Sequence, residues 1–271
     1  MFSAASSLTT PKAYFGVLLR QWRAARRMSQ LTLALDADIS TRHLSCVETG
    51  RAQPSREMVL RLAKALEIPL RERNTLLLAA GYAPHYRQTS LDAPEMEAAR
   101  QAVDLLLRQL EPYPGIVIDR YWNTLRMNSG MKQFLGRFPI SDSVKPHNGV
   151  RFVFHPNGLR PFVENWDVVA ALIIQRVHRE VVANPSDETM KCFLEELLSC
   201  PAVPSRWRVL DIGDSPPPFL TINYRWNNST LRFFSTLTTF GSPQDVALQE
   251  MRIETFFPAD EATRAALMAA R

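Results

Sequence analysis

The sequence predicts two domains, an all-α domain of five short helices followed by an α+β domain with an antiparallel sheet and helices. Three observations support this prediction. Up to residue 82, apolar residues recur at helical spacing between capping residues. Beyond residue 115, short strand-like segments alternate with helical ones. The charge also divides, because residues 12–88 hold 13 Lys and Arg against 6 Asp and Glu, whereas the remainder holds 19 against 21.

The domain boundaries follow from the places where these patterns change. A chain of 271 residues accommodates two domains of ordinary size. The predicted divisions are a tail at 1–11, a helical domain at 12–82, a linker at 83–95 and an α+β domain at 96–271.

Capping residues mark the five helices of the first domain. Small polar side chains accept the free amides at a helix start, and glycine is favoured just beyond a helix end. The predicted N-caps are Thr10, Ser29, Ser40 and Ser55, and the predicted stops are Gly50 and Gly81. Asp38 lies in the short turn between the second and third helices, where it must tolerate a left-handed conformation.

A short turn between the second and third helices indicates a helix-turn-helix. In this arrangement the second helix braces the third, whose first residues reach into a major groove about 12 Å wide. The outward side of the third helix carries Thr41, Arg42, Ser45 and Thr49. Together with the local basic charge, this pattern predicts duplex DNA as a partner. For His43, packing within the helix is favoured over base contact.

The stretch "SQLTLALDADISTRHLSCVETGRAQPSREMVLRLAKAL" resembles the lambda-repressor-like, or Xre-type, DNA-binding domain. The resemblance implies base-facing positions at 41, 42 and 46, phosphate-facing positions at 30, 40, 49 and 51, and an internal salt bridge between Arg23 and Glu48. Two departures are Asp38 in place of the usual turn glycine and Cys46 in place of a longer side chain. The predicted DNA-binding residues are Gln30, Ser40, Thr41, Arg42, Ser45, Cys46, Thr49 and Arg51.

The second domain begins with two strand-like segments, at 115–119 and 123–128. Helices are predicted at 129–136 and across most of 162–200, and four further strands at 206–212, 219–226, 230–240 and 251–258. The "NNS" at 227–229 is typical of a hairpin turn. This order predicts an antiparallel sheet with helices on one face and looks like a PAS-type sensor.

Three stretches of this domain resemble the ligand-binding domain of MmyB-like transcription regulators. They are "EPYPGIVIDRYWNTLRMN", "HPNGLRPFVENW" and "LRFFSTLTTFGSPQDVALQEMRIETFFPADEAT". With the first domain, the resemblance covers nearly the whole chain. It implies that a small apolar ligand, such as an acyl chain or fatty acid, binds inside the domain.

The residues themselves leave the location of such a pocket open. Aromatic residues at strand spacing can form a core or a cavity wall, and the residue pattern favours a core. Arg160 can bind a carboxylate through two hydrogen bonds or pair with Glu164 one turn later, and Asn128 can cap the helix that follows it. The predicted ligand-binding residues are Tyr113, Trp122, Asn128, His155, Arg160, Trp166, Phe234 and Thr236.

The sequence predicts neither an enzyme nor a metal or cofactor site. It lacks the nucleophile-elbow, dinucleotide, phosphate-loop and zinc-protease motifs, and its cysteines and histidines do not form a ligand pattern at zinc spacing. The longest apolar run, 168–174, is too short to span a bilayer, and the first residues do not form a secretion signal. We therefore expect a cytoplasmic protein without a membrane partner.

The expected function is a sequence-specific, DNA-binding transcription regulator whose C-terminal domain binds a small apolar ligand. A homodimer is expected, since helix-turn-helix proteins commonly bind paired half-sites, and repression is the default mode. Two alternatives stay open: a protein-interaction adaptor with a vestigial helix-turn-helix, and a DNA binder without ligand control. Duplex affinity that falls steeply with salt distinguishes a DNA binder from the adaptor.

Overall fold

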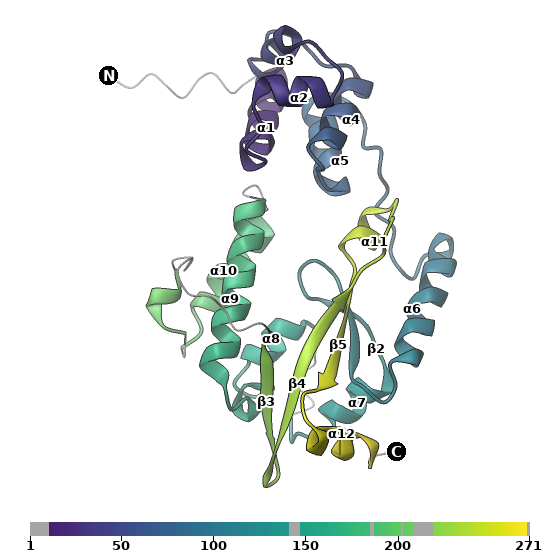
Figure 1. Ribbon diagram of the computed structural model, residues 1–271, viewed down its shortest axis with the longest axis vertical. Helices are drawn as coiled ribbons and strands as arrows, with labels where there is room; N and C mark the ends of the chain where they lie inside the picture. Colours follow the sequence, from purple (N-terminus) through teal and green to yellow (C-terminus); the bar gives the residue numbers. More distant parts are fainter. Residues whose placement is uncertain (1–10, 141–146, 185–186, 202, 209–218, 270–271) are drawn as a thin grey trace. The chain divides into compact units, whose positions relative to one another are not determined.

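The computed structural model describes residues 11–140, 147–184, 187–201, 203–208 and 219–269 (Figure 1). The chain folds into two compact units. Unit 1 contains residues 1–90 and 241–249, and unit 2 contains residues 91–240 and 250–271. The connection between the last two strands of unit 2 is therefore part of unit 1. Thr10, one of the predicted caps, lies outside the described residues.

Unit 1 has the five predicted helices. They are α1 (Pro11–Ala25), α2 (Gln30–Asp36), α3 (Thr41–Glu48), α4 (Arg56–Ala65) and α5 (Leu70–Ala79). The predicted serine caps are confirmed, because the hydroxyls of Ser29, Ser40 and Ser55 accept the backbone amides of residues 32, 43 and 58. Asp38 has a φ of 52°, so the aspartate does adopt the left-handed conformation of the turn.

The helices of unit 1 pack closely around an aliphatic core. Leu19 of α1, Leu33 of α2 and Leu44 of α3 are fully buried in this core. A Cβ atom on Gly16 would lie 2.3 Å from the carbonyl oxygen of Glu48, so α1 approaches the backbone of α3 at a point where only glycine fits. This contact fixes the position of α3 against α1.

Unit 2 is built on a five-stranded antiparallel sheet of order β2-β1-β5-β4-β3. The strands are β1 (Gly115–Ile118), β2 (Thr124–Met127), β3 (Thr221–Trp226), β4 (Ser229–Thr238) and β5 (Arg252–Pro258). Five of the six predicted strands and the hairpin turn between β3 and β4 are confirmed. The sixth prediction, at 206–212, is wrong for its first residues, because Ser205–Arg208 is the 3-10 helix η3; residues 209–212 lie outside the described part.

Helices flank this sheet and its connections (Figure 1). The α-helices are α6 (Glu97–Gln109), α7 (Ser129–Leu135), α8 (Gly149–Phe154), α9 (Trp166–Ala183), α10 (Glu188–Leu198) and α12 (Glu261–Met268). Short 3-10 helices are η1 (Pro94–Met96) and η2 (Arg160–Phe162), and α11 (Val246–Glu250) lies in the chain between β4 and β5. The apolar helix α9 packs against α10, and both contribute to the core of unit 2.

None of the described helices is long and apolar enough to cross a membrane.

Candidate DNA-binding surface and ligand cavity

A buried carboxylate joins the first three helices of unit 1. Glu48 is 1% exposed, and Arg23 donates to both of its oxygens, from Nε at 2.7 Å and from Nη2 at 3.0 Å. Gln30 Nε2 also donates to Glu48, at 2.7 Å. The hydrogen bonds with Glu48 raise the pKa of Arg23. The predicted internal salt bridge is thus present, and it braces α3 from α1 and α2.

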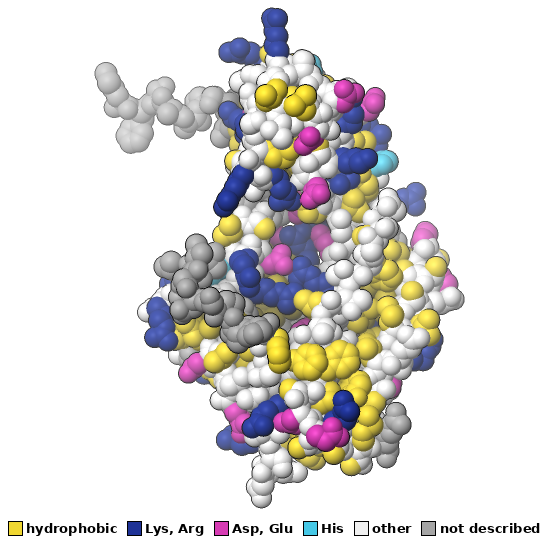
Figure 2. Space-filling model, in the orientation of Figure 1, with side chains coloured by type: hydrophobic (Ala, Val, Ile, Leu, Met, Phe, Trp, Pro, Cys, Tyr) yellow, Lys and Arg dark blue, Asp and Glu magenta, His cyan; other side chains and the backbone are white. Residues whose placement is uncertain are grey.

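The brace leaves the start of α3 at the surface. Thr41 and Arg42 are exposed, while His43, Ser45 and Cys46 are half-buried. Figure 2 shows Lys and Arg side chains standing out from the surface over α3. This end of α3 can therefore present polar and basic groups to a groove, as the sequence predicts.

The remaining predicted DNA-binding residues lie at or beyond the two ends of α3 and at the start of α2. Ser40 caps α3, and the Thr49 hydroxyl donates to the carbonyl of Ser45 at 2.8 Å. Arg51 is exposed, whereas Gln30 is half-buried and bonded to Glu48. Three of these four side chains therefore fix the geometry of the helix-turn-helix or its ends, in addition to any phosphate contact.

Unit 2 contains a cavity of about 370 Å³ that is partly open to solvent, and this volume lies within the size range of small-molecule sites. Its walls come from β1, β3, β4, β5, α7, α8 and α9, and most of the lining side chains are aliphatic or aromatic. The walls include Ile118, Phe134, Val150, Leu172, Ile222 and Phe256. A cavity of this composition accepts an apolar molecule.

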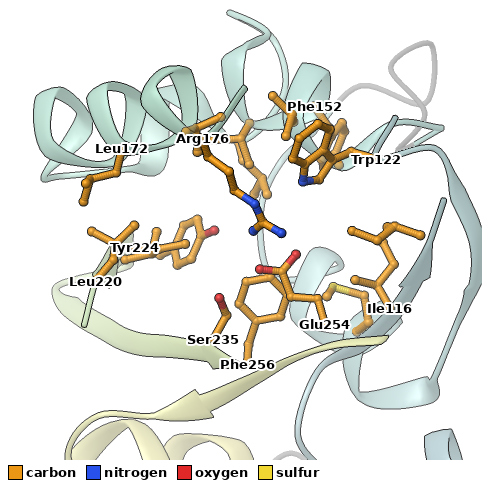
Figure 3. Close-up of a pocket in the computed structure, with 18 of the residues that line it drawn as sticks. Ile116, Trp122, Phe152, Leu172, Arg176, Leu220, Tyr224, Ser235, Glu254 and Phe256 are labelled. Atoms are coloured by element: carbon orange, nitrogen blue, oxygen red, sulfur yellow. The ribbon is translucent and has the colours of Figure 1, made fainter. Parts of the chain in front are cut away.

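One region of the cavity is charged (Figure 3). The guanidinium of Arg176, on α9, points toward the carboxylate of Glu254, on β5. The hydroxyl of Ser235, on β4, hydrogen-bonds this carboxylate. Burial raises the pKa of Glu254, whereas Ser235, Arg176 and Arg252 oppose that rise. For Arg176, burial and then the neighbouring Arg252 lower the pKa.

Trp122 lies beside this charged region. Its ring is contacted by two guanidinium groups, since the Cζ atoms of Arg176 and Arg252 lie 5.4 and 5.8 Å from the ring centroid. Arg252 is held from its other side by Glu180, at 2.9 Å. Trp122, in the turn between β1 and β2, also has a φ of 61°, a left-handed conformation that costs energy for a bulky residue. Trp122 therefore links the apolar wall to the charged groups.

Of the eight predicted ligand-binding residues, Trp122 alone lines this cavity. Asn128 is buried and used locally, because its Oδ1 accepts the amides of Gly115 and Met131 at 2.9 and 2.8 Å. Since Ser235 points into the cavity, its neighbours Phe234 and Thr236 lie on the opposite face of the sheet.

The other predicted residues lie away from this cavity as well. Tyr113 stacks edge-on against Phe257, at 5.4 Å between ring centroids. Arg160 lies over the ring of Trp166, with its Cζ 5.1 Å from the centroid. Its suggested partner Glu164 instead accepts the hydroxyl of Thr230, and His155 is exposed and accepts the amide of Asn157.

Arg176 and Glu254 were not among the predicted residues, although both leave a signal in the sequence. Arg176 interrupts the apolar run of α9, and Glu254 occupies the same strand face as Phe256. Burying a charged side chain lowers the stability of the fold unless the charge is paired. A charged residue at an inward position therefore indicates a functional site. Among the described residues, no group of three or more His, Cys, Asp or Glu is arranged to hold a metal ion.

Two family models match the chain. Residues 99–270 match the MmyB-like transcription regulator ligand binding domain, and residues 15–76 match a helix-turn-helix domain. No curated protein gives a significant match.

Among the solved structures that are similar to the chain, the following three have TM-scores well below that of a shared whole-chain fold. The restriction-modification controller protein C.AhdI from Aeromonas hydrophila is 38% identical, covers 22% of this chain and 92% of its own, and has a TM-score of 0.22. The clp gene regulator ClgR from C. glutamicum is 27% identical over 26% of this chain and 88% of its own, with a TM-score of 0.24. An RNA-binding Light-Oxygen-Voltage receptor is 12% identical over 96% of this chain and 63% of its own, with a TM-score of 0.28.

Proposed function

The chain belongs to the MmyB-like transcription regulators, and from this premise we propose that it is a cytoplasmic, dimeric repressor controlled by a fatty acid or similar amphiphile in the cavity of unit 2. It is a helix-turn-helix regulator with a ligand-binding domain. The antiparallel sheet with helices around a partly open cavity supports a PAS-like sensor. The observation that carries the proposal is this largely apolar cavity with a single charged region.

The charged region supports an acidic head group. Three guanidinium groups, of Arg176, Arg179 and Arg252, lie in or beside the cavity wall, against the carboxylates of Glu254 and Glu180. An anionic head group would balance this excess of positive charge and bind Arg176, while the acyl chain contacts the apolar walls. A second buried anion beside Glu254 would also favour the protonated form of that carboxyl group.

The ligand proposal is tested with two molecules that differ only at the head group. Dodecanoate should raise the melting temperature of the full-length protein more than dodecan-1-ol does. In Arg176→Met this preference should be lost, whereas the exposed Arg206→Met serves as a matched control. Equal shifts for acid and alcohol in the wild type would reject the acidic head group, and no shift with either would reject the apolar ligand.

The DNA proposal is tested at Arg42. A bidentate arginine–guanine contact discriminates against the wrong base by about 1–3 kcal/mol. Arg42→Ala should therefore weaken binding to a duplex selected by the wild-type protein more than binding to a random duplex. Arg20→Ala, which removes an exposed arginine on α1, is the control. Equal losses on both duplexes would contradict a reading role for Arg42.

Wild-type affinity for the selected duplex should also fall by about tenfold or more between 50 and 200 mM salt. A duplex affinity that does not change with salt would favour the adaptor instead.

Repression is tested by transcription. Addition of the protein should lower transcription from a promoter that contains the selected sequence, and an increase would identify an activator.

A further inference from the structure

The connection between β4 and β5 joins the strands that carry the charged region of the cavity, yet it packs within unit 1. Residues 241–249, called the strap below, belong to unit 1, whereas β4 and β5 belong to unit 2. Ser235 lies on β4 and Glu254 on β5. The strap is therefore a covalent extension of the two strands that hold the polar cavity groups.

Several hydrogen bonds attach the strap to the chain that follows α5. Both carboxylate oxygens of Asp245 accept the amide of Thr89, at 3.3 and 3.1 Å, and the Thr89 hydroxyl donates to Oδ2 at 2.7 Å. The amide of Val246 donates to the carbonyl of Arg87 at 2.8 Å, and the Val246 side chain is 1% exposed. The strap is thus anchored by polar contacts and by burial.

The strap also caps α5 itself. Pro69, at the N-cap of α5, provides no side-chain hydrogen bond, so the first amides of the helix need another partner. Gln249 Oε1 accepts the amide of Leu70 at 2.7 Å, across 179 residues of sequence. Because α5 packs against α1, and α1 holds α3 through Gly16 and Arg23, this cap acts on the framework that positions α3.

At the end of the strap, two neighbouring residues are held by different units. Gln249 accepts a hydrogen bond from the amide of Leu70 in unit 1. Glu250 accepts a hydrogen bond from Nη1 of Arg120 at 3.0 Å within unit 2. Glu250 is followed by β5, which reaches Glu254 four residues later. The residue that caps α5 and the residue held by Arg120 are therefore joined by one peptide bond.

We propose that the strap is the coupling element through which ligand binding in the cavity alters the DNA-reading helix. A head group that engages Arg176 or Glu254 favours one position of β5, and the bond from Gln249 to Leu70 passes that preference to α5. This inference rests on the proposed ligand control, because a coupling element needs two sites whose affinities depend on each other.

The test measures the dissociation constant of the selected duplex with and without saturating dodecanoate. In full-length wild-type protein, dodecanoate should change this constant by about fivefold or more. In Gln249→Met, which keeps the length of the side chain but removes the acceptor, the change should fall below about twofold while the affinity for dodecanoate stays the same. Gln244→Met, an exposed glutamine of the same strap, should behave as the wild type.

Hydrogen exchange adds a measurement that does not depend on a variant. Dodecanoate should change the exchange rate of the amides at Leu70–Arg73 in the wild type.

A second variant serves if Gln249→Met fails to fold. Thr89→Val removes the hydrogen bond from the Thr89 hydroxyl to Asp245 and should also reduce the effect of dodecanoate on DNA affinity.

A Gln249→Met variant that folds and keeps the full wild-type ligand effect would overturn the coupling role of the strap and leave ligand control intact. A wild-type protein that binds dodecanoate without any change in DNA affinity would overturn ligand control, and the strap proposal with it.

Discussion

Removing the carboxylate of Glu48 should release α3 from the rest of unit 1. In Glu48→Ala, three hydrogen bonds of 2.7, 3.0 and 2.7 Å disappear, and the guanidinium of Arg23 loses its charged partner. Breaking a buried ion pair in this way costs about 3–5 kcal/mol. Because the Arg23 side chain keeps 19% of its surface exposed, we expect the lower end of that range, about 3 kcal/mol.

Hydrogen exchange followed by mass spectrometry measures this loss where it occurs. A cost of about 3 kcal/mol corresponds to roughly a hundredfold faster exchange of the α3 amides, since about 1.4 kcal/mol is a factor of ten. Binding to the selected duplex should weaken in parallel. Glu57→Ala removes an exposed carboxylate from α4 and should change exchange in α3 little. Unchanged α3 exchange in Glu48→Ala would refute the bracing role of Glu48.

Three further predictions follow from the packing and charges. Gly16→Ala should destabilise unit 1 by about 1–3 kcal/mol, seen as a lower melting temperature, because the new methyl group meets the backbone of Glu48; an unchanged melting temperature would contradict that close approach. Asn128→Ala should destabilise unit 2 by about 1–3 kcal/mol in denaturant unfolding, because two amides lose their acceptor. The affinity of the folded variant for dodecanoate should persist. A selective loss of ligand affinity would instead place Asn128 in the ligand site. The pKa of Glu254 is raised in the folded state, so the folded form binds the proton more tightly and its stability falls as pH rises above the ordinary carboxyl pKa of 4.5. Glu254→Gln should remove this part of the pH dependence of the melting temperature. A pH profile identical to that of the wild type would contradict the raised pKa of Glu254.

The helical framework of unit 1 could be predicted because its signals are local. A capping serine acts on an amide three residues away, and the left-handed turn at Asp38 depends on one residue type. The partnership of Arg23 with Glu48 came from the family resemblance, since the 25 residues between them carry no periodic signal for it.

The cavity was harder to predict because strand spacing does not determine which face is inward. Phe234 and Thr236 alternate correctly with Ser235, but the cavity lies on the Ser235 side of β4. The search for pocket residues on apolar strand faces also missed Arg176 and Glu254, because these two residues are charged and nevertheless point into the cavity. The cap from Gln249 to Leu70 joins residues 179 apart, and only the folded chain shows it.

The most direct test of ligand control combines a filled cavity with DNA binding. Leu172→Trp adds bulk to a half-buried residue of the cavity wall and should exclude the acyl chain. Fluorescence anisotropy of the selected duplex, at fixed salt, should show a change of about fivefold or more in affinity when dodecanoate saturates the wild-type protein, and less than about twofold in Leu172→Trp. Equal duplex affinities for free and dodecanoate-saturated wild-type protein would contradict ligand control by the cavity.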